Sequence, residues 1–224
     1  MTLSPAVLRK NEVWIPKFKD RFKGETLTII GNGPSILRHD LSKINTTTMG
    51  VNLVNLSTGF TPGLVVAIDN MTYRRVDFWG GNSHYFIPKD PDLEDIERIR
   101  NNRHFSTFPR AASWDTNKEG FVFSHDVTLT GAHAYCSLFV AVEVATFIGF
   151  RNFILVGFDL GDVYGFPEKH AVGRKTFYKD TEAYQREIIG WMVGYLKEYA
   201  TFLDTSPGHR IRCMPWRKYE EVFP

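Results

Sequence analysis

A short apolar run that passes directly into a glycine-rich loop is the feature that most constrains the fold of this chain. The run is Leu27–Ile30, and the loop that follows it, Gly31–Ser35, reads Gly-Asn-Gly-Pro-Ser. A run without polar alternation suits a strand that is covered on both faces, as in a parallel sheet. The glycines allow close backbone approach, and a helix that begins after such a loop presents free amides to an anion. We therefore expect a phosphate-binding loop, although a tight turn without a ligand has the same pattern.

Strand-like and helix-like segments alternate along the rest of the chain, which predicts an α/β fold with a mostly parallel central sheet. Residues 1–24 form a basic lead-in, and residues 25–224 form one domain with a lid loop at about 161–179. The helix over 130–149 is expected to be capped by Thr130 and to end at Gly149. The other expected strands are 48–52, 64–68, 83–87, 153–157 and a closing strand at 211–213, and the other expected helices are 90–101 and 180–203, with a short helix or turn at 36–44.

Polar residues stand at the ends of several expected strands. Asn52, Asp69, Asn70 and Asp159 each follow an apolar run. In open parallel sheets the ligand crevice lies at the carboxyl ends of the strands. Asparagine and aspartate also cap turns, so each of them alone has a structural explanation. Taken together, they predict one binding site at this edge of the sheet, which includes the loop residues Gly31, Asn32, Gly33 and Ser35.

The loop differs from two well-known phosphate-binding motifs. Ile36 stands where the dinucleotide-binding pattern has its third glycine, and no Gly-Lys-Ser/Thr follows the loop. The seven histidines are scattered without zinc-ligand spacing, so no metal site is predicted. Two cysteines and an N-terminus without an apolar signal run favour a reducing, cytoplasmic location. A net charge of +2 indicates no general attraction to nucleic acid.

Three blocks of the sequence resemble the bacterial sialyltransferases of glycosyltransferase family 42. They are the loop at 31–35, the strand end Gly50–Asn52, and the block Thr128–Gly131 that leads through a long helix to Gly149–Asp159. The chain also resembles a related family named for the archaeal 6-hydroxymethylpterin diphosphokinase, which shares the Gly-x-Gly-Pro-Ser loop. The resemblance covers residues 26–215 and implies a single Rossmann-like, nucleotide-sugar-binding domain.

The sialyltransferase resemblance implies transfer of a sugar from a CMP-sugar to a hydroxyl acceptor, such as a glycan or a glycolipid, without a metal. A lid histidine acts as the base in that family, and His170 is the nearest candidate because Arg174 stands at the position of the catalytic histidine. Arg174 then suits the departing phosphate, with Tyr164 nearby. No tightly bound cofactor is implied. The residues implied to hold the nucleotide are Asn32, Ser35, Asn52, Thr130, Gly131 and Gly157.

Two other functions stay open from the sequence. A pterin-type diphosphokinase needs Mg²⁺, for which Asp69 and Asp159 are suitable oxygen ligands. A non-catalytic accessory protein for nucleotide binding or nucleic-acid modification needs only the nucleotide site. The basic and aromatic lead-in, with Trp14 and Phe18, fits a tail packed on the domain best; it also fits peripheral membrane contact and, less well, nucleic acid. The sequence is also compatible with a homo-oligomer.

Overall fold

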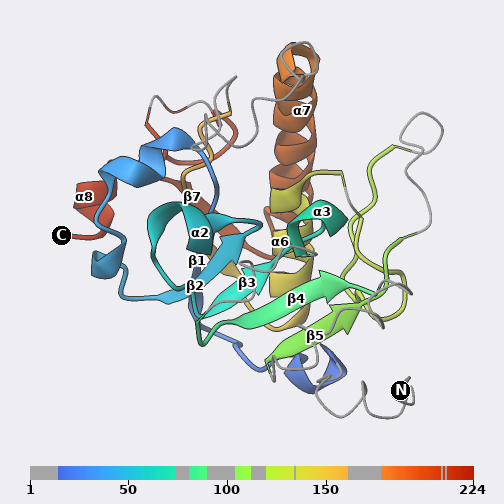
Figure 1. Ribbon diagram of the computed structural model, residues 1–224. Helices are drawn as coiled ribbons and strands as arrows, with labels where there is room; N and C mark the ends of the chain where they lie inside the picture. Colours follow the sequence, from blue (N-terminus) through green and yellow to red (C-terminus); the bar gives the residue numbers. More distant parts are fainter. Residues whose placement is uncertain are drawn as a thin grey trace.

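The computed structural model describes residues 15–73, 81–89, 104–111, 120–133, 135–160, 178–207, 209 and 211–224. Seven strands of this part form one sheet, in which every neighbouring pair is parallel. The predicted α/β fold with a parallel central sheet is therefore confirmed (Figure 1). The strands are β1 (Thr26–Ile30), β2 (Thr47–Val51), β3 (Leu64–Val66), β4 (His84–Pro88), β5 (Phe105–Phe108), β6 (Asn152–Val156) and β7 (Thr201–Asp204). The helices are η1 (Ile15–Phe18), η2 (Pro34–Arg38), η3 (Leu41–Lys43), α2 (Val54–Thr58), α3 (Asn70–Tyr73), α6 (Ser137–Phe147), α7 (Tyr178–Leu196) and α8 (Tyr219–Val222).

The order in which the chain adds strands to the sheet reverses next to β1. The order is β5-β4-β3-β2-β1-β6-β7, so the chain moves outward from β1 to β5 and then returns to the other side of β1. Ile30 of β1 lies opposite Gly50 of β2 and Val156 of β6. In such sheets the crevice for a ligand forms at this reversal, outside the carboxyl ends of the strands. Here it lies beyond the ends of β1 and β6, where Gly31 and Gly157 follow.

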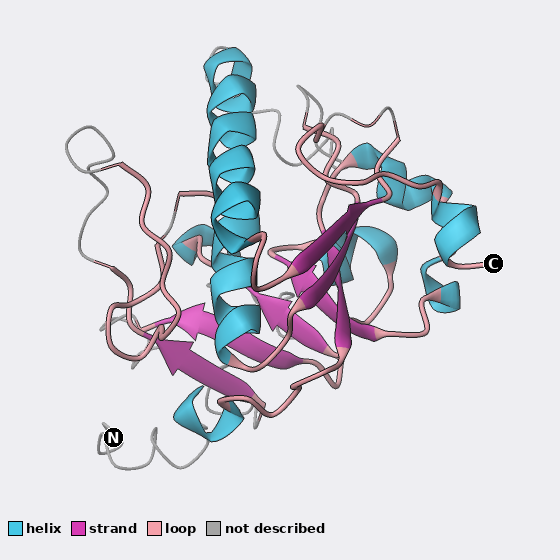
Figure 2. Ribbon diagram, turned by 180° about the vertical axis from the view of Figure 1, so that it is seen from behind, coloured by secondary structure: helices cyan, strands magenta, loops and turns pink. Residues whose placement is uncertain are grey.

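Helices cover both faces of the sheet, because each central strand has apolar residues on both sides. α6 and α7 cover one face, as Figures 1 and 2 show. Leu138 to Phe147 of α6 are all buried, and they pack with Ile29 and Leu155. The next residues along the strands, Ile30 and Val156, face the opposite way, because successive strand side chains alternate. They pack with Ile36, Tyr219 and Phe223 from η2 and the C-terminal segment, in a cluster that also holds Leu41 and Val54.

The predicted start of the helix at Thr130 is wrong, since α6 begins at Ser137. The hydroxyl of Thr130 lies 2.5 Å from that of Ser124 and caps no helix. Gly131 has a φ of 76°, in the left-handed region, and a Cβ there would lie 2.6 Å from the amide nitrogen of Ala111. Because this turn and its packing on residue 111 interrupt the helical pattern, the chain enters the helix only after Cys136.

The predicted end of the chain's last long helix also differs from the structure. α7 ends at Leu196, and residues 201–203, placed in the helix by the sequence pattern, belong to β7 instead. β7 pairs with β6, and the rings of Phe153 and Phe202 stack at 5.1 Å. The expected closing strand at 211–213 is a turn. Tertiary pairing with β6 therefore overrides a local pattern that reads as helix. The expected helix at 90–101 lies outside the described residues, as does the lid except for residues 178 and 179, which begin α7.

The described part of the lead-in packs on the domain. Ile15 and Phe18 of η1 are buried in the main core, and the ring of Phe18 lies 4.5 Å from that of His84 and 5.4 Å from that of Phe86. Arg21 lies over the ring of Phe18. Trp14 lies outside the described residues. Among the helices that the structure describes, none has the length and apolar character needed to cross a membrane.

His84 makes the packing of η1 sensitive to acid. Burial, aided by the nearby charges of His104 and Arg21, lowers the pKa of His84 from 6.5 to about 4. The folded state therefore binds this proton less readily than the unfolded chain, so stability is full above pH 6.5 and falls as the pH drops towards 4. We expect a loss of about 2 kcal/mol from this group between pH 7 and pH 4.

The His84→Gln variant tests this expectation. The Gln side-chain nitrogen can keep the hydrogen bond that joins His84 Nε2 and Ser106 Oγ at 2.9 Å, and it does not titrate. Urea unfolding at both pH values should show a smaller acid loss for the variant than for the unmodified protein. An equal loss would remove His84 as the cause.

Candidate functional site

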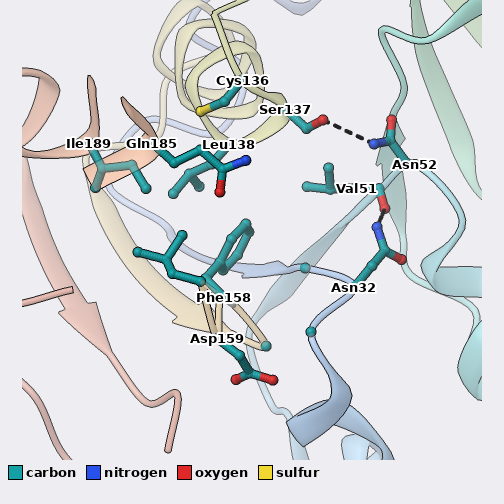
Figure 3. Close-up of a pocket in the computed structure, with 14 residues that line it drawn as sticks. Asn32, Val51, Asn52, Cys136, Ser137, Leu138, Phe158, Asp159, Gln185 and Ile189 are labelled. Carbon is teal, nitrogen blue, oxygen red and sulfur yellow. Dashed lines mark hydrogen bonds between the residues drawn. The ribbon is translucent and has the colours of Figure 1, made fainter. Parts of the chain in front are cut away.

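A pocket of about 170 Å³ lies at the reversal of strand order, beyond the carboxyl ends of β1, β2 and β6. The start of α6 and the middle of α7 close its other sides (Figure 3). Five segments line it, namely 31–33 after β1, 51–52 at the end of β2, 136–138 at the start of α6, 157–160 after β6, and Gln185 with Ile189 on α7. The structure therefore brings together the predicted residues Gly31, Asn32, Gly33, Asn52, Gly157 and Asp159.

The loops after β1 and β6 are interlocked by their backbones. The amide of Gly31 donates to the carbonyl of Val156, and the amide of Gly33 donates to the carbonyl of Gly157, both at 2.8 Å. A Cβ at position 33 would lie 2.5 Å from Oδ2 of Asp159. A Cβ at position 157 would lie 2.1 Å from Cγ2 of Ile36. The glycines therefore allow two protein loops to meet, and this contact explains them without a ligand.

Asp159 occupies the position at which the sequence predicts a bound anion. The amide of Ser35 donates to Oδ2 of Asp159 at 2.7 Å, and the hydroxyl of Ser35 donates to Oδ1 at 2.6 Å. The helix that follows, η2, is a 3-10 helix of five residues. The amide and the hydroxyl of Ser35 are therefore not free for a phosphate, because a carboxylate of the chain itself already accepts both hydrogen bonds.

Two asparagines bridge the strand ends that surround the pocket. The side-chain nitrogen of Asn32 donates to the carbonyl of Val51 at 2.8 Å, and that of Asn52 donates to the hydroxyl of Ser137 at 3.0 Å (Figure 3). A backbone carbonyl only accepts, which fixes the orientation of the Asn32 amide. Asn52 has a φ of 54°, a conformation that asparagine tolerates better than most residues. Both side-chain oxygens are buried without a hydrogen-bond partner. The asparagines thus join β1 to β2 and β2 to α6.

The described wall of the pocket carries little charge. Asp159 is the one charged side chain among the described residues that line it, and no basic side chain lines it there. Leu138, Phe158 and Ile189 contribute apolar surface. Burial raises the pKa of the Cys136 thiol to about 11, so the protonated thiol, a poor nucleophile, is favoured near neutral pH.

Several predicted site residues lie away from this pocket. The Asp69 carbonyl accepts from the amides of Thr72 and Tyr73 at 2.9 and 3.3 Å, at the start of α3. Asp69, Thr130 and Gly131 do not line the pocket, and the side chain of Asn70 lies outside the described part of the structure. Asp69 and Asp159 are therefore not presented together to a Mg²⁺ ion in it. The described residues contain no cluster of three or more metal-ligating side chains. His170, Arg174 and Tyr164 lie outside the described residues.

A buried carboxylate in α6 holds the segment that leads to the pocket. Glu143 is fully buried and accepts hydrogen bonds from the amides of Ser124 and His133, each at 2.7 Å, and from Nδ1 of His133 at 2.8 Å. Burial raises the pKa of Glu143, and these N–H donors oppose the rise. The network fastens residues 124–133 to α6 just before Cys136 and Ser137 reach the pocket. The sequence signal that could have revealed this network is an acidic residue within an apolar helix.

Other pocket residues were missed by the sequence analysis. Phe158 stands within a block that was recognised, but nothing in the sequence distinguished it from a core residue. Gln185 and Ile189 are spaced i, i+4 on a predicted helix, so they share a face. The sequence does not reveal that this face is the one turned to the pocket. No protein-family model and no curated protein matches the sequence. The resemblance to family 42 thus rests on the sequence blocks alone.

Proposed function

We propose that this protein is a nucleotide-sugar-dependent glycosyltransferase that holds the nucleoside part of its donor in the pocket between β1 and β6. The observation that carries the proposal is the position of the pocket. It lies where the strand order reverses, and the ends of β1, β2 and β6 converge on it. Nucleotides bind at this place in open parallel sheets. The blocks that resemble the sialyltransferases contribute three of its five wall segments.

The chemistry of the wall suits a nucleoside. Phe158 and Leu138 offer apolar surface to a base, and Gln185 adds a side-chain amide that both donates and accepts. Small-molecule sites commonly combine apolar walls with a few such polar groups. Under this proposal the roles that the resemblance implies for the lid residues are kept. His170 takes the proton of the acceptor hydroxyl, Arg174 binds the departing phosphate with Tyr164 nearby, and the donor is a CMP-sugar.

The Mg²⁺-dependent diphosphokinase has less support. Its two expected metal ligands do not share one site, because Asp159 hydrogen-bonds to Ser35 and Asp69 does not line the pocket. A binding and activity screen distinguishes the candidates. The protein is titrated with CMP, UDP, GDP and ADP and their sugars, with and without Mg²⁺. Donor hydrolysis without metal supports the transferase, a strict Mg²⁺ requirement supports the diphosphokinase, and binding without either reaction supports an accessory protein.

Filling the pocket from α7 should weaken nucleotide binding. Gln185 lines the pocket from a helix and takes no part in the interlocked loops, so Gln185→Trp fills the space without disturbing them. We expect affinity for the nucleotide found in the screen to fall by about tenfold or more. Glu187→Trp, at an exposed position on the same helix, is the matched control. Calorimetry should show unchanged affinity for the control, and equal affinity for both variants would place the nucleotide elsewhere.

A further inference from the structure

Several hydrogen-bond donors around the pocket are already used within the protein. The amides of Gly31 and Gly33 donate to backbone carbonyls across the two loops. The amide and the hydroxyl of Ser35 donate to Asp159. The amide of Phe158 donates to Ser206 Oγ at 2.9 Å. Together with the bridging amides of Asn32 and Asn52, these donors point to other groups of the protein and not to a phosphate in the pocket.

Asp159 retains capacity to accept hydrogen bonds. An ionised carboxylate has about four lone-pair sites, and Ser35 occupies one on each oxygen. Figure 3 shows Asp159 at the edge of the pocket, on the loop that also carries Phe158. No basic side chain among the described wall residues neutralises its charge. A phosphate placed beside it would meet a like charge at close range, and such an encounter is unfavourable.

We propose that Asp159 recognises a vicinal pair of hydroxyl groups, and that this pair belongs to the ribose of the bound nucleotide. Two neighbouring hydroxyls present two donors to the two oxygens of one carboxylate, which matches the capacity that remains. The charged phosphate then lies away from the Gly31–Ser35 loop. Asp159 acts in specificity and takes no part in the chemistry. This inference rests on the proposed function, because it assigns the ligand of the same pocket.

The test compares ribonucleotides with analogues that lack the hydroxyl pair. CMP, UMP, GMP and AMP are titrated calorimetrically beside their 2′,3′-dideoxy counterparts. We expect the ribonucleotide that binds best to bind about 10- to 100-fold more tightly than its dideoxy analogue, because hydrogen bonds to a charged acceptor are lost. Equal affinities would overturn the inference and leave the proposed function standing. Failure of every nucleotide to bind would overturn both.

The variant Asp159→Asn assigns the discrimination to this carboxylate. The Asn oxygen can accept from the Ser35 amide and the Asn nitrogen can donate to the Ser35 hydroxyl, since a hydroxyl both donates and accepts. The interlocked loops are therefore kept, while the charge and one of the two acceptor oxygens are lost. The preference for the ribonucleotide should fall to within about threefold of unity. Glu187→Gln, an exposed charge removal outside the pocket, should keep the full preference, and an unchanged preference in Asp159→Asn would assign the hydroxyl pair to another group.

Discussion

Replacing Gly157 with alanine is expected to lower the free energy of unfolding by about 2–5 kcal/mol. Gly157 has a φ of 72°, in the left-handed region, which is unfavourable for a residue with a Cβ. The added Cβ would also lie 2.1 Å from Cγ2 of Ile36, so the loop after β6 must move away from η2. Urea unfolding measures the loss. Nucleotide affinity should fall with it, because Gly33 and Asp159 depend on the same contact.

Gly59 provides a matched control for the backbone conformation. Its φ is 67°, close to that of Gly157, but a Cβ at this position meets no atom within 4 Å. Gly59→Ala should therefore cost only the conformational term, about 1 kcal/mol. In an Ile36→Ala background, which removes the clashing Cγ2, the cost of Gly157→Ala should fall towards the Gly59 value. A cost at Gly157 no greater than that at Gly59 in the unmodified background would contradict the close contact with Ile36.

Replacing Glu143 with alanine should be the most damaging single change in α6. It would leave the amides of Ser124 and His133 and Nδ1 of His133 without their acceptor in a fully buried site. Breaking a buried charged network costs about 3–5 kcal/mol, and a cavity adds to this loss. We expect the loss in urea unfolding, together with weaker nucleotide binding because Ser137 and Asn52 lose their fixed spacing.

Glu143→Gln separates the loss of hydrogen bonds from the loss of volume. It preserves the shape and one side-chain oxygen. Its NH₂ group, however, replaces an acceptor oxygen and then faces an N–H donor of the protein. An intermediate loss of about 1–3 kcal/mol is expected. Thr146→Ala, one turn later on the same helix, removes a hydroxyl that has no hydrogen-bond partner and should cost less than either. Stability of Glu143→Ala close to that of the unmodified protein would show that the three N–H groups find other acceptors.

The sequence was a good guide to the centre of the sheet. Buried strands in parallel sheets need apolar side chains on both faces, so Leu27–Ile30 and residues 153–157 stand out without any tertiary information. The convergence of Asn32, Asn52 and Asp159 was likewise predictable, because the carboxyl ends of parallel strands meet at one edge. The ends of elements were less predictable. Thr130 is a residue type that often caps helices, but its hydroxyl meets that of Ser124 across a turn at 127–129 that no local pattern reveals.

The sequence by itself determined the fold class, the central strands and the edge of the sheet at which the polar strand ends gather, because periodicity and composition are local properties. Only the tertiary structure decided what those polar groups do. Ser35 and Asp159 are 124 positions apart in the chain, yet they hydrogen-bond to each other, so the expected anion position is filled from within. Partners of this kind depend on which loops the strand order brings together. Asp159, a carboxylate of the kind that binds metals, therefore hydrogen-bonds to Ser35 and lines the pocket.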